Sequence, residues 1–521
     1  MMTKPLLARL ILSLLLGAIA VFSYSPFDIW PLAYVSFTGL LLLTKQKSAK
    51  QTALIAFIWG FGYFLAGIHW VYVSINQYGD LSIPVAIIIL SLLVAYLALY
   101  PMLFAVLLRL FNKVCPAYSL KQFIILAPLI WQITEYIRST LLNGFAWLQF
   151  GYSQLESPLA GLFPILGING VNLLFTICCG LLAYLVQQFI QRRLHLSKYK
   201  LHIYGASCTI LVIFAASFWF KHINWTQLDY TRQTNITLIQ GNIPQSLRWS
   251  SKQLNKTLQT YAELTQEHIK DSDIIIWPEA AITDFEYNQQ PYLKALDLYA
   301  RQHDTAIALG IVDLVKNEYD YQIYNALIVL GGLTPYQYPT KNRYIKHHLV
   351  PFGEYIPLQQ LLSPIAKALN IPMSSMSAGP AIQEPLTMKG FKFVTVICYE
   401  VILSNLLWQN FTSDTDFLLT VSNDAWFGNS IGPWQHLQMA RTRALEFGRT
   451  LLRSTNNGIT TVISPKGSIT KQLPQFQTAA LSVTLNPNTG LTPYARWGNY
   501  PYYLILTIFI IIIFLRQKHL K

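Results

Sequence analysis

Three polar residues stand at the ends of apolar segments whose composition is typical of buried strands. Glu279 lies in WPEAA, Lys346 in YIKHHLVPFGEY, and Cys398 follows the apolar run of FVTVICYEVI. A thiol with a pKa of about 8.5 is mostly protonated at pH 7, so a nucleophilic cysteine needs a base. A carboxylate can supply that base, and an ammonium group can stabilise a thiolate and an oxyanion. These three residue types therefore suffice for acyl transfer through a thioester.

Each of the three residues also has an ordinary structural interpretation. Glu279 could be a surface carboxylate after a strand, Lys346 a solvated lysine in a basic loop, and Cys398 a buried, inert thiol. No local motif spans the long stretches of sequence that separate them. Only a tertiary fold can bring them together, so the elements that would position them matter next.

The segment from about 222 to 500 has the pattern of an α/β domain. Its short apolar runs lack polar alternation, which predicts strands covered on both faces. Helices between them, for example 251–270 and 433–455, would pack against the sheet faces. The runs predicted to be strands are 235–243, 273–280, 305–312, 324–332, 391–400, 416–424 and 458–465.

Long apolar segments fill the rest of the chain. Of the 521 residues, 53% are hydrophobic and only 12% are charged, which is too apolar for an ordinary soluble protein. A membrane span needs about 20 mostly apolar residues. Eight segments qualify, at 5–22, 27–44, 53–76, 82–110, 122–138, 161–189, 202–220 and 501–515. We therefore predict a transmembrane domain of about seven spans at 1–221, a globular domain at 222–500, and a transmembrane helix with a short tail at 501–521.

The net charge of +14 belongs mainly to the predicted membrane segments. Residues 1–221 hold 14 Lys and Arg against 4 Asp and Glu, whereas residues 222–500 hold 21 against 20. The globular segment is thus nearly neutral, and it has no basic stripe with interleaved aromatic residues. We expect no nucleic-acid binding.

Basic residues alternate along the connections between the predicted spans. The connection after the second span holds Lys45, Lys47 and Lys50, whereas the connections on either side of it hold no Lys or Arg. Excess Lys and Arg marks the cytoplasmic side of a membrane. Counting spans by this rule predicts that both termini are cytoplasmic and that the 222–500 domain lies outside the cytoplasm. An alternative for residues 1–22 is a cleaved signal peptide with AIA at 18–20 as its processing site, which leaves the large domain outside as well.

Five cysteines are present, and four of them lie in or beside predicted spans, where apolar burial explains them. These four are Cys115, Cys178, Cys179 and Cys208. Cys398 alone lies in the predicted outer domain. It has no second thiol there to pair with in an oxidising compartment, so it is either buried and inert or kept for its reactivity.

Two further stretches are unusual for connections. LLNGFAWLQFGYSQLE, at 141–156, is long and rich in aromatic residues, and 354–377 is apolar, proline-punctuated and nearly uncharged. The second stretch is either a core loop or helix, or an arm that dips into the bilayer surface or covers a lipid site. Both stretches could shield a thioester from water.

Several motifs carry a resemblance to a known family. WPEAA, the lysine in KHHLVPFGEYIPL, and VICYE resemble the Glu–Lys–Cys signature of the nitrilase, or carbon–nitrogen hydrolase, superfamily. Together with PMSSMSAGP, VSNDAWFG, ARTRALEFGR and the apolar spans, they make nearly the whole chain resemble the apolipoprotein N-acyltransferases of bacterial inner membranes. This resemblance implies the αββα sandwich of nitrilases on a multi-span helical bundle.

The resemblance also implies roles for individual residues. Glu279 would be the general base, Lys346 the stabiliser of the oxyanion, and Cys398 the nucleophile. Glu354 would be the superfamily's additional carboxylate, which orients Lys346 or the incoming amine.

Three more positions match the family's pattern and would support the site. Tyr399 and Glu400 lie beside the nucleophile, and Trp249 lies in SLRW. We expect Glu400 to position substrate or the neighbouring backbone and not to take the thiol's proton. A purely structural carboxylate is the alternative for Glu400.

The function implied by the resemblance is the last acylation of a lipoprotein in the inner membrane, with the catalytic domain in the periplasm. The acyl donor would be a membrane phospholipid, and the acceptor the α-amino group of the S-diacylglyceryl-cysteine at the N-terminus of an apolipoprotein. We expect ping-pong kinetics, no metal or other cofactor, and a monomer. A membrane-tethered amidase or nitrilase acting on a small amide is the alternative. A transporter is a second one, for which Glu135 would be the main ionisable residue within a span.

Overall fold

The computed structural model describes residues 4–44, 48–79, 81–111, 119–191, 200–248, 250–316, 321–356 and 376–518. The chain forms two compact units. One, here the helical unit, comprises Met1–Tyr72, Ser82–Ile223 and Trp497–Lys521. The other, here the α/β unit, comprises Val73–Leu81 and Asn224–Arg496.

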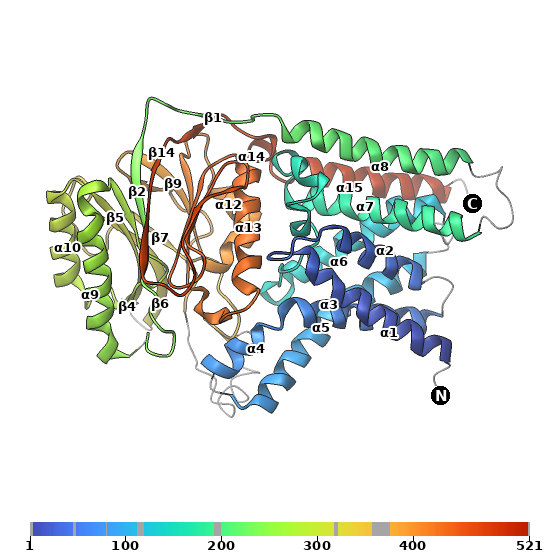
Figure 1. Cartoon of the computed structure of the whole chain (residues 1–521), viewed down its shortest axis with the longest axis horizontal. Coiled ribbons are helices and arrows are strands. Elements are labelled where there is room, and N and C mark those ends of the chain that lie inside the picture. Colours follow the sequence, from blue (N-terminus) through green and yellow to red (C-terminus); the bar gives the residue numbers. More distant parts are fainter. Residues whose placement is uncertain are drawn as a thin grey trace. The chain divides into compact units, whose positions relative to one another are not determined.

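Each apolar segment that was predicted to span a membrane contains a helix of the helical unit (Figure 1). Five helical segments are long and apolar enough to cross a membrane, namely Pro5–Ser23, Ala49–Ile68, Ile83–Leu110, Pro158–Ile190 and Ile203–Lys221. Two apolar helices, Pro31–Leu43 and Tyr500–Ile513, are shorter. The main helices are α1 (Lys4–Ile19), α2 (Pro31–Leu43), α3 (Ala49–Ile68), α5 (Ile83–Leu110), α6 (Ala127–Thr140), α7 (Phe163–Gln191), α8 (Lys200–Lys221) and α15 (Tyr500–Lys518).

The third predicted span, 53–76, is shorter in the structure than in the prediction. Helix α3 ends at Ile68, and the π-helix η2 (Ser74–Tyr78) belongs to the α/β unit. There the hydroxyl of Ser74 donates to the carbonyl oxygen of Trp426 at 2.7 Å, and the ring of Tyr78 meets the Trp426 ring edge-on. A hydropathy pattern cannot show that these residues leave the bundle, because their partners lie far away in the sequence.

Helices α1 and α3 approach each other through glycines. An ideal Cβ on Gly17 would lie 2.0 Å from the carbonyl oxygen of Trp59, and one on Gly62 would lie 2.3 Å from that of Leu14. Small residues allow this close contact, which dispersion forces then stabilise between apolar helices.

The aromatic connection at 141–156 is part of the core of the helical unit. Trp147, Phe150 and Tyr152 are buried. Arg138 of α6 holds this connection by donating to the carbonyl oxygen of Trp147 at 2.7 Å, while its guanidinium also pairs with Glu135 at 2.8 Å. Glu135 is therefore neutralised within its own helix.

The α/β unit contains a mixed sheet of seven strands in the order β14-β2-β3-β5-β6-β7, with β4 paired to β5. Strands β2, β3 and β5 run parallel, and β6, β7 and β14 are antiparallel to their neighbours. The strands are β2 (Thr234–Gln240), β3 (Ile274–Ile276), β4 (Ile282–Phe285), β5 (Ala306–Lys316), β6 (Tyr321–Leu330), β7 (Arg343–Ile345) and β14 (Ala479–Leu485).

A second sheet has six strands in the order β13-β12-β11-β10-β9-β8. Its three central strands, β9, β10 and β11, are parallel. The strands are β8 (Leu386–Met388), β9 (Phe391–Ile397), β10 (Phe417–Ser422), β11 (Leu451–Thr455), β12 (Thr461–Ile463) and β13 (Ile469–Gln472), and a short pair, β1 (Gln227–Leu228) and β15 (Asn488–Thr489), stands apart.

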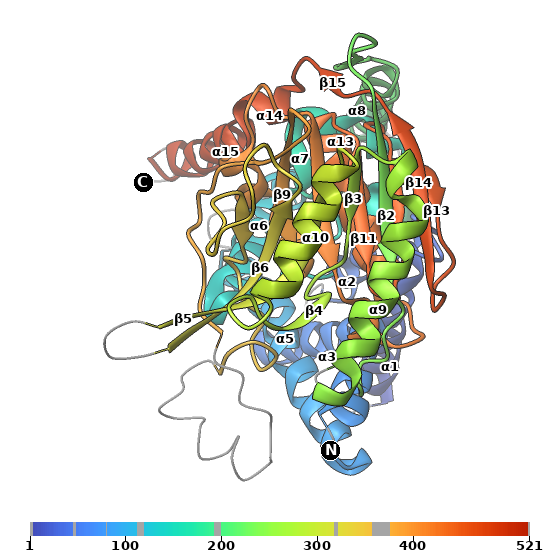
Figure 2. The same cartoon turned by 90° about the vertical axis from the view of Figure 1, so that its left-hand side faces the viewer.

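The two sheets pack face to face, and helices cover their outer faces (Figures 1 and 2). One apolar core joins Leu238 and Ile276 of the first sheet to Phe417 and Leu419 of the second. The outer face of the first sheet is covered by α9 (Ser251–His268) and α10 (Gln290–Gln302). Helices α12 (Ser404–Asn410) and α13 (Gly432–Phe447) lie on the second sheet. The predicted αββα sandwich is confirmed.

One predicted element is partly wrong. The pattern at 433–455 predicts a single helix, but α13 ends at Phe447, and residues 451–455 form β11 beside the central strand β10. Gly448, with φ of +61°, ends the helix because a residue without Cβ adopts the left-handed conformation at little cost. The apolar residues after it suit both a helix and a buried strand.

The close approach of α1 and α3 gives a testable prediction. Replacing Gly62 by alanine should lower the unfolding free energy by about 1–3 kcal/mol, because the helices must separate to admit a methyl group. The matched control is Gly205→Ala in α8, where nothing lies within 4 Å of the added Cβ. Thermal unfolding of both variants in detergent would test this, and equal melting temperatures would refute the packing argument.

Candidate active site

The predicted chemical residues follow directly after strands of both sheets. Glu279 follows β3, Lys346 follows β7, and Cys398 follows β9. Carboxyl ends of neighbouring parallel strands meet at one edge of a sheet, and ligands bind at such edges. The sandwich places the edges of its two sheets together here, since the backbone N–H of Asn423, after β10, donates to Glu279 Oε2 at 2.8 Å.

Lys346 is the centre of a buried group of charges. Its Nζ lies 2.8 Å from Glu354 Oε1 and 3.4 Å from Glu279 Oε1. Asn325 Nδ2 bridges the same two carboxylates, at 2.8 Å from Glu279 and 3.4 Å from Glu354. The backbone N–H of Val350 donates to the other oxygen of Glu354 at 2.8 Å. Two carboxylates and one ammonium group are thus held in fixed positions.

These contacts set the protonation of the lysine. Burial alone would lower the pKa of Lys346, but the charges of Glu354 and Glu279 outweigh it and raise the pKa above its usual range. Lys346 is therefore an ammonium group at neutral pH. It can donate hydrogen bonds but cannot act as a base.

The thiol of Cys398 is protonated in the resting site. Burial and the charge of Glu279 raise its pKa, Lys346 opposes the rise, and the net pKa is about 12. The thiol form therefore predominates at pH 7. A reaction at this sulfur therefore needs a base that removes the proton during the step.

Cys398 is the first residue of the 3₁₀ turn η9 (Cys398–Ile402), which follows β9 directly. Its φ of +57° lies in the left-handed region, which is unusual for a residue with a Cβ. Strained backbone of this kind persists only where surrounding contacts hold it. The next residue, Tyr399, stacks its ring on that of His348, with centroids 5.7 Å apart and planes at 15°.

Glu400 supplies contacts that hold this turn. Its Oε2 accepts hydrogen bonds from the backbone N–H of Ile397 at 2.7 Å and the hydroxyl of Tyr344 at 3.0 Å. Its Oε1 accepts from the backbone N–H groups of His347 at 2.7 Å and His348 at 2.9 Å. Burial raises its pKa, and the backbone hydrogen bonds work against that rise. The carboxylate thus joins the turn at the nucleophile to the segment that carries Lys346.

The backbone beside Glu279 is also held in a strained form. Arg248 Nη2 donates to the carbonyl oxygens of Glu279 and Ala280, and Ala280 has a φ of +42°. Gly310 on β5 leaves room for this turn, since a Cβ there would lie 2.4 Å from the carbonyl oxygen of Pro278.

The structure thus brings together Glu279, Lys346, Glu354 and Cys398, with Tyr399 and Glu400 beside them. The remaining predicted residue, Trp249, lies outside the described residues, as does most of the 354–377 stretch.

The sequence analysis did not single out Asn325, Arg248 or Asn423. Asn423 lies in VSNDAWFG, so the resemblance had already drawn attention to its segment. Arg248 lies in SLRW, to which the resemblance had also drawn attention, whereas Asn325 lies in none of the quoted motifs. Only the fold reveals the contacts of both.

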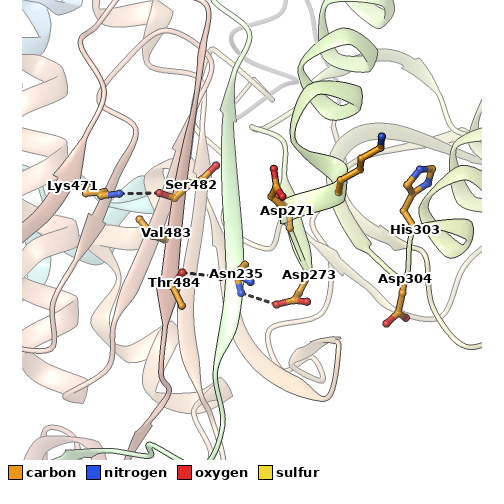
Figure 3. A pocket seen from close by; sticks show the side chains of 11 residues that line it. Asn235, Asp271, Asp273, His303, Asp304, Lys471, Ser482, Val483 and Thr484 are labelled. Carbon is orange, nitrogen blue, oxygen red and sulfur yellow. Dashed lines mark hydrogen bonds between the residues drawn. The ribbon is translucent and has the colours of Figure 1, made fainter.

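A surface depression of about 600 Å³ lies elsewhere on the α/β unit. Its lining includes Asn235, Asp273, His303 and Asp304, near the amino ends of β2 and β3 (Figure 3). Polar groups there pair with one another, as in the 2.7 Å bond from the backbone N–H of Asn235 to Asp273. None of the predicted chemical residues lines it, so it is separate from the candidate active site.

The fold and the site define a class. An αββα sandwich with Glu, Lys and Cys at strand ends is the arrangement expected of carbon–nitrogen hydrolases, and the family model described as "Carbon-nitrogen hydrolase" matches residues 235–494. A second family model, "Apolipoprotein N-acyltransferase N-terminal domain", matches residues 16–181.

Curated relatives identify the family within this class. An apolipoprotein N-acyltransferase of Vibrio cholerae serotype O1 is 43% identical over 99% of this chain and 98% of its own length. Relatives with the same description from Photobacterium profundum and Haemophilus influenzae are 42% and 39% identical, over 95% and 98% of this chain and 93% and 95% of their own lengths. The chain belongs to the apolipoprotein N-acyltransferase family. It is a membrane enzyme that transfers an acyl group to an apolipoprotein.

The contacts of Glu400 give a second prediction. In Glu400→Gln, either orientation of the amide turns its NH₂ group toward two hydrogen-bond donors, because each carboxylate oxygen accepts two hydrogen bonds. The unfolding free energy of the α/β unit should fall by about 3 kcal/mol, and acyl transfer should fall with it.

Tyr344→Phe is the matched control. This variant removes one of the four donors to Glu400 and places no NH₂ group opposite a donor. The unfolding free energy should therefore fall by only about 1 kcal/mol. Chemical unfolding followed by tryptophan fluorescence would compare the variants. A Glu400→Gln protein as stable as Tyr344→Phe would show that Glu400 does not hold the turn.

Proposed function

We propose that this enzyme takes an acyl chain from a membrane phospholipid and passes it, through a thioester on Cys398, to an apolipoprotein. The acceptor is the α-amino group of the N-terminal S-diacylglyceryl-cysteine. The observation that carries the proposal is the protonated thiol of Cys398 in the field of a fixed carboxylate, Glu279, and a fixed ammonium group, Lys346.

In the first half-reaction, Glu279 takes the proton from Cys398 as the sulfur attacks the ester carbonyl carbon of the phospholipid. Lys346 donates a hydrogen bond to the oxyanion of the tetrahedral intermediate. The C–O bond then breaks, and the lysophospholipid leaves with the proton that Glu279 held. Asn325 and the backbone N–H of Asn423 support this role because they fix both oxygens of Glu279.

In the second half-reaction, the amine of the acceptor attacks the thioester carbonyl. Glu279 accepts a proton from the amine, the C–S bond breaks, and the sulfur regains a proton. Donor and acceptor use one site in turn, which gives ping-pong kinetics. Glu354 orients Lys346 through its 2.8 Å contact, and Glu400 holds the turn that presents the sulfur. We assign supporting roles to Tyr399 and Trp249, because both match the family's pattern.

We place the enzyme in the bacterial inner membrane as a monomer. Residues 1–221 and 501–521 form its membrane part, both termini are cytoplasmic, and the 222–500 domain is periplasmic. The alternating basic connections support this orientation. A phospholipid donor fits it, because acyl-CoA and ATP would not be expected outside the cytoplasm, whereas phospholipid is already present in the membrane.

The thioester makes a third prediction. Purified full-length enzyme incubated with phospholipid vesicles should gain one acyl mass in intact-protein mass spectrometry. An acyl group on a cysteine is bound as a thioester, so neutral hydroxylamine should remove it. Cys398→Ser should show no such adduct and should not convert a diacylated lipopeptide to the triacylated form.

Cys208→Ser is the matched control, since Cys208 is an exposed cysteine of the helical unit and should be dispensable. An adduct that persists in Cys398→Ser would place the acyl group elsewhere. Conversion of the lipopeptide by Cys398→Ser at the wild-type rate would overturn the proposed mechanism.

A further inference from the structure

Four polar side chains form a buried group that reaches the sulfur of Cys398 through Ser422, and none of them is among the predicted site residues. They are Ser422, Asp424, His436 and Arg453, and all four are at most 1% exposed. Buried polar groups usually have hydrogen-bond partners, and each of these four side chains has at least one, although Nε and Nη1 of Arg453 have none within the described part of the chain.

Strand β10 places the first of them. Val421 faces the core between the sheets, so the next residue, Ser422, faces the opposite way, where α13 packs. Its hydroxyl oxygen lies 2.7 Å from Asp424 Oδ1 and 3.4 Å from Cys398 Sγ. One hydroxyl proton thus has two acceptors.

His436 joins the turn at Cys398 to the charged pair behind it. Its Nε2 lies 3.1 Å from the carbonyl oxygen of Cys398, which can only accept, so Nε2 carries a hydrogen. Its Nδ1 lies 3.1 Å from both Asp424 Oδ1 and Arg453 Nη2. Burial and the charge of Arg453 lower the pKa of His436, which agrees with a neutral imidazole.

Asp424 is an anion held by two neighbours besides Ser422. Arg453 Nη2 donates to its Oδ2 at 2.6 Å, and its Oδ1 lies 3.1 Å from His436 Nδ1. Burial alone would raise the pKa of Asp424, but the charge of Arg453, the contact with His436 and the hydrogen bond from Ser422 hold it well below its usual range. While Cys398 is a neutral thiol, the stronger acceptor for the Ser422 proton is therefore Asp424.

That preference reverses when the sulfur becomes charged. We propose that Ser422 is a further catalytic residue, whose hydroxyl turns from Asp424 to the sulfur of Cys398 whenever the sulfur is anionic. This happens as the thiol loses its proton to Glu279 during attack, and again as the C–S bond breaks and the sulfur keeps the electron pair. The O–H bond of Ser422 stays intact, and only its hydrogen bond changes partner. The inference rests on the proposed thioester at Cys398.

The other three members are positioning residues. Arg453 keeps Asp424 paired through Oδ2 while the hydroxyl is turned away. His436 holds the carbonyl of Cys398, and with it the left-handed turn that aims the sulfur. Without these contacts the hydroxyl would have no fixed distance to the sulfur.

The thiol is the group to measure, and its charged surroundings come from several elements. The charges of Glu279 and Asp424 raise the pKa of Cys398, and that of Lys346 lowers it. The charge of Cys398 in turn raises the pKa of Arg248. The bond from Ser422 lowers the pKa of Cys398 against the rise caused by burial. Replacing Ser422 leaves all these charges in place.

The experiment is alkylation of Cys398 by iodoacetamide in full-length enzyme in detergent, between pH 8 and 10. Peptide mass spectrometry separates Cys398 from the other cysteines. Because the thiolate reacts, the rate reports the thiolate fraction. Ser422→Ala should slow alkylation at least tenfold at each pH, and Ser422→Thr should restore it.

The matched control is Thr420→Val. Thr420 lies on the same face of β10, is fully buried, and its hydroxyl has no hydrogen-bond partner within the described part of the chain. Its replacement should leave the alkylation rate unchanged. In acyl transfer, Ser422→Ala should lower kcat at least tenfold and leave KM for the lipopeptide unchanged.

Two results would overturn the inference. An unchanged alkylation rate in Ser422→Ala would show that the hydroxyl does not donate to the sulfur. A faster rate would show that it only packs against the thiol, since loosened packing exposes the sulfur. If alkylation is slow in Ser422→Ala but wild-type Cys398 gains no acyl adduct, the proposed thioester is wrong. The hydrogen bond from Ser422 to the sulfur would still be supported.

Discussion

The rest of the site depends on the buried ammonium group of Lys346. A buried charge that loses its partner is strongly destabilising, whereas one held between carboxylates is tolerated. Glu279 and Glu354 provide these partners, and Asn325 bridges them. The four residues come from different parts of the chain, so the charge cluster forms only when both the strand ends and the loop after β7 are in place. The same contacts therefore stabilise the buried charge of Lys346 and hold the reactive groups in position.

The nucleophile is constrained from two sides. Glu400 ties the turn at Cys398 to the segment after β7, and His436 holds the carbonyl of Cys398 from α13. Both contacts oppose the tendency of a left-handed residue to relax. The sulfur thus stays in position although the backbone that carries it is unfavourable. Such preorganisation costs stability in the turn, and the hydrogen bonds around it offset that cost.

The charge state of the resting site suits an enzyme that uses a reactive intermediate. Cys398 is a neutral thiol with a pKa of about 12, and Lys346 is an ammonium group. Little thiolate exists until a base removes the proton. In the proposed mechanism, the sulfur gains nucleophilic character only where Glu279 can act on it, which limits side reactions of the thiol.

The sequence alone determined the main features of this protein. Apolar runs, turn residues and the WPEAA, KHHLVPFGEY and VICYE motifs sufficed for the helical segments, most strands, the αββα class and the family. These signals are local, because hydropathy and motif spacing are properties of neighbouring residues.

Tertiary structure alone decided the remaining features. It ended α13 at Gly448 and made 451–455 a central strand, and it moved Ser74–Tyr78 to the α/β unit. It also assembled Asn325, Ser422, Asp424 and His436 around the reactive groups. Ser422 and Asp424 lie in the VSNDAWFG motif, but the motif does not show their contacts, and Asn325 and His436 lie in none of the quoted motifs. The contacts could not be predicted because they join residues that are distant in sequence or depend on which face of a strand the fold turns toward the site.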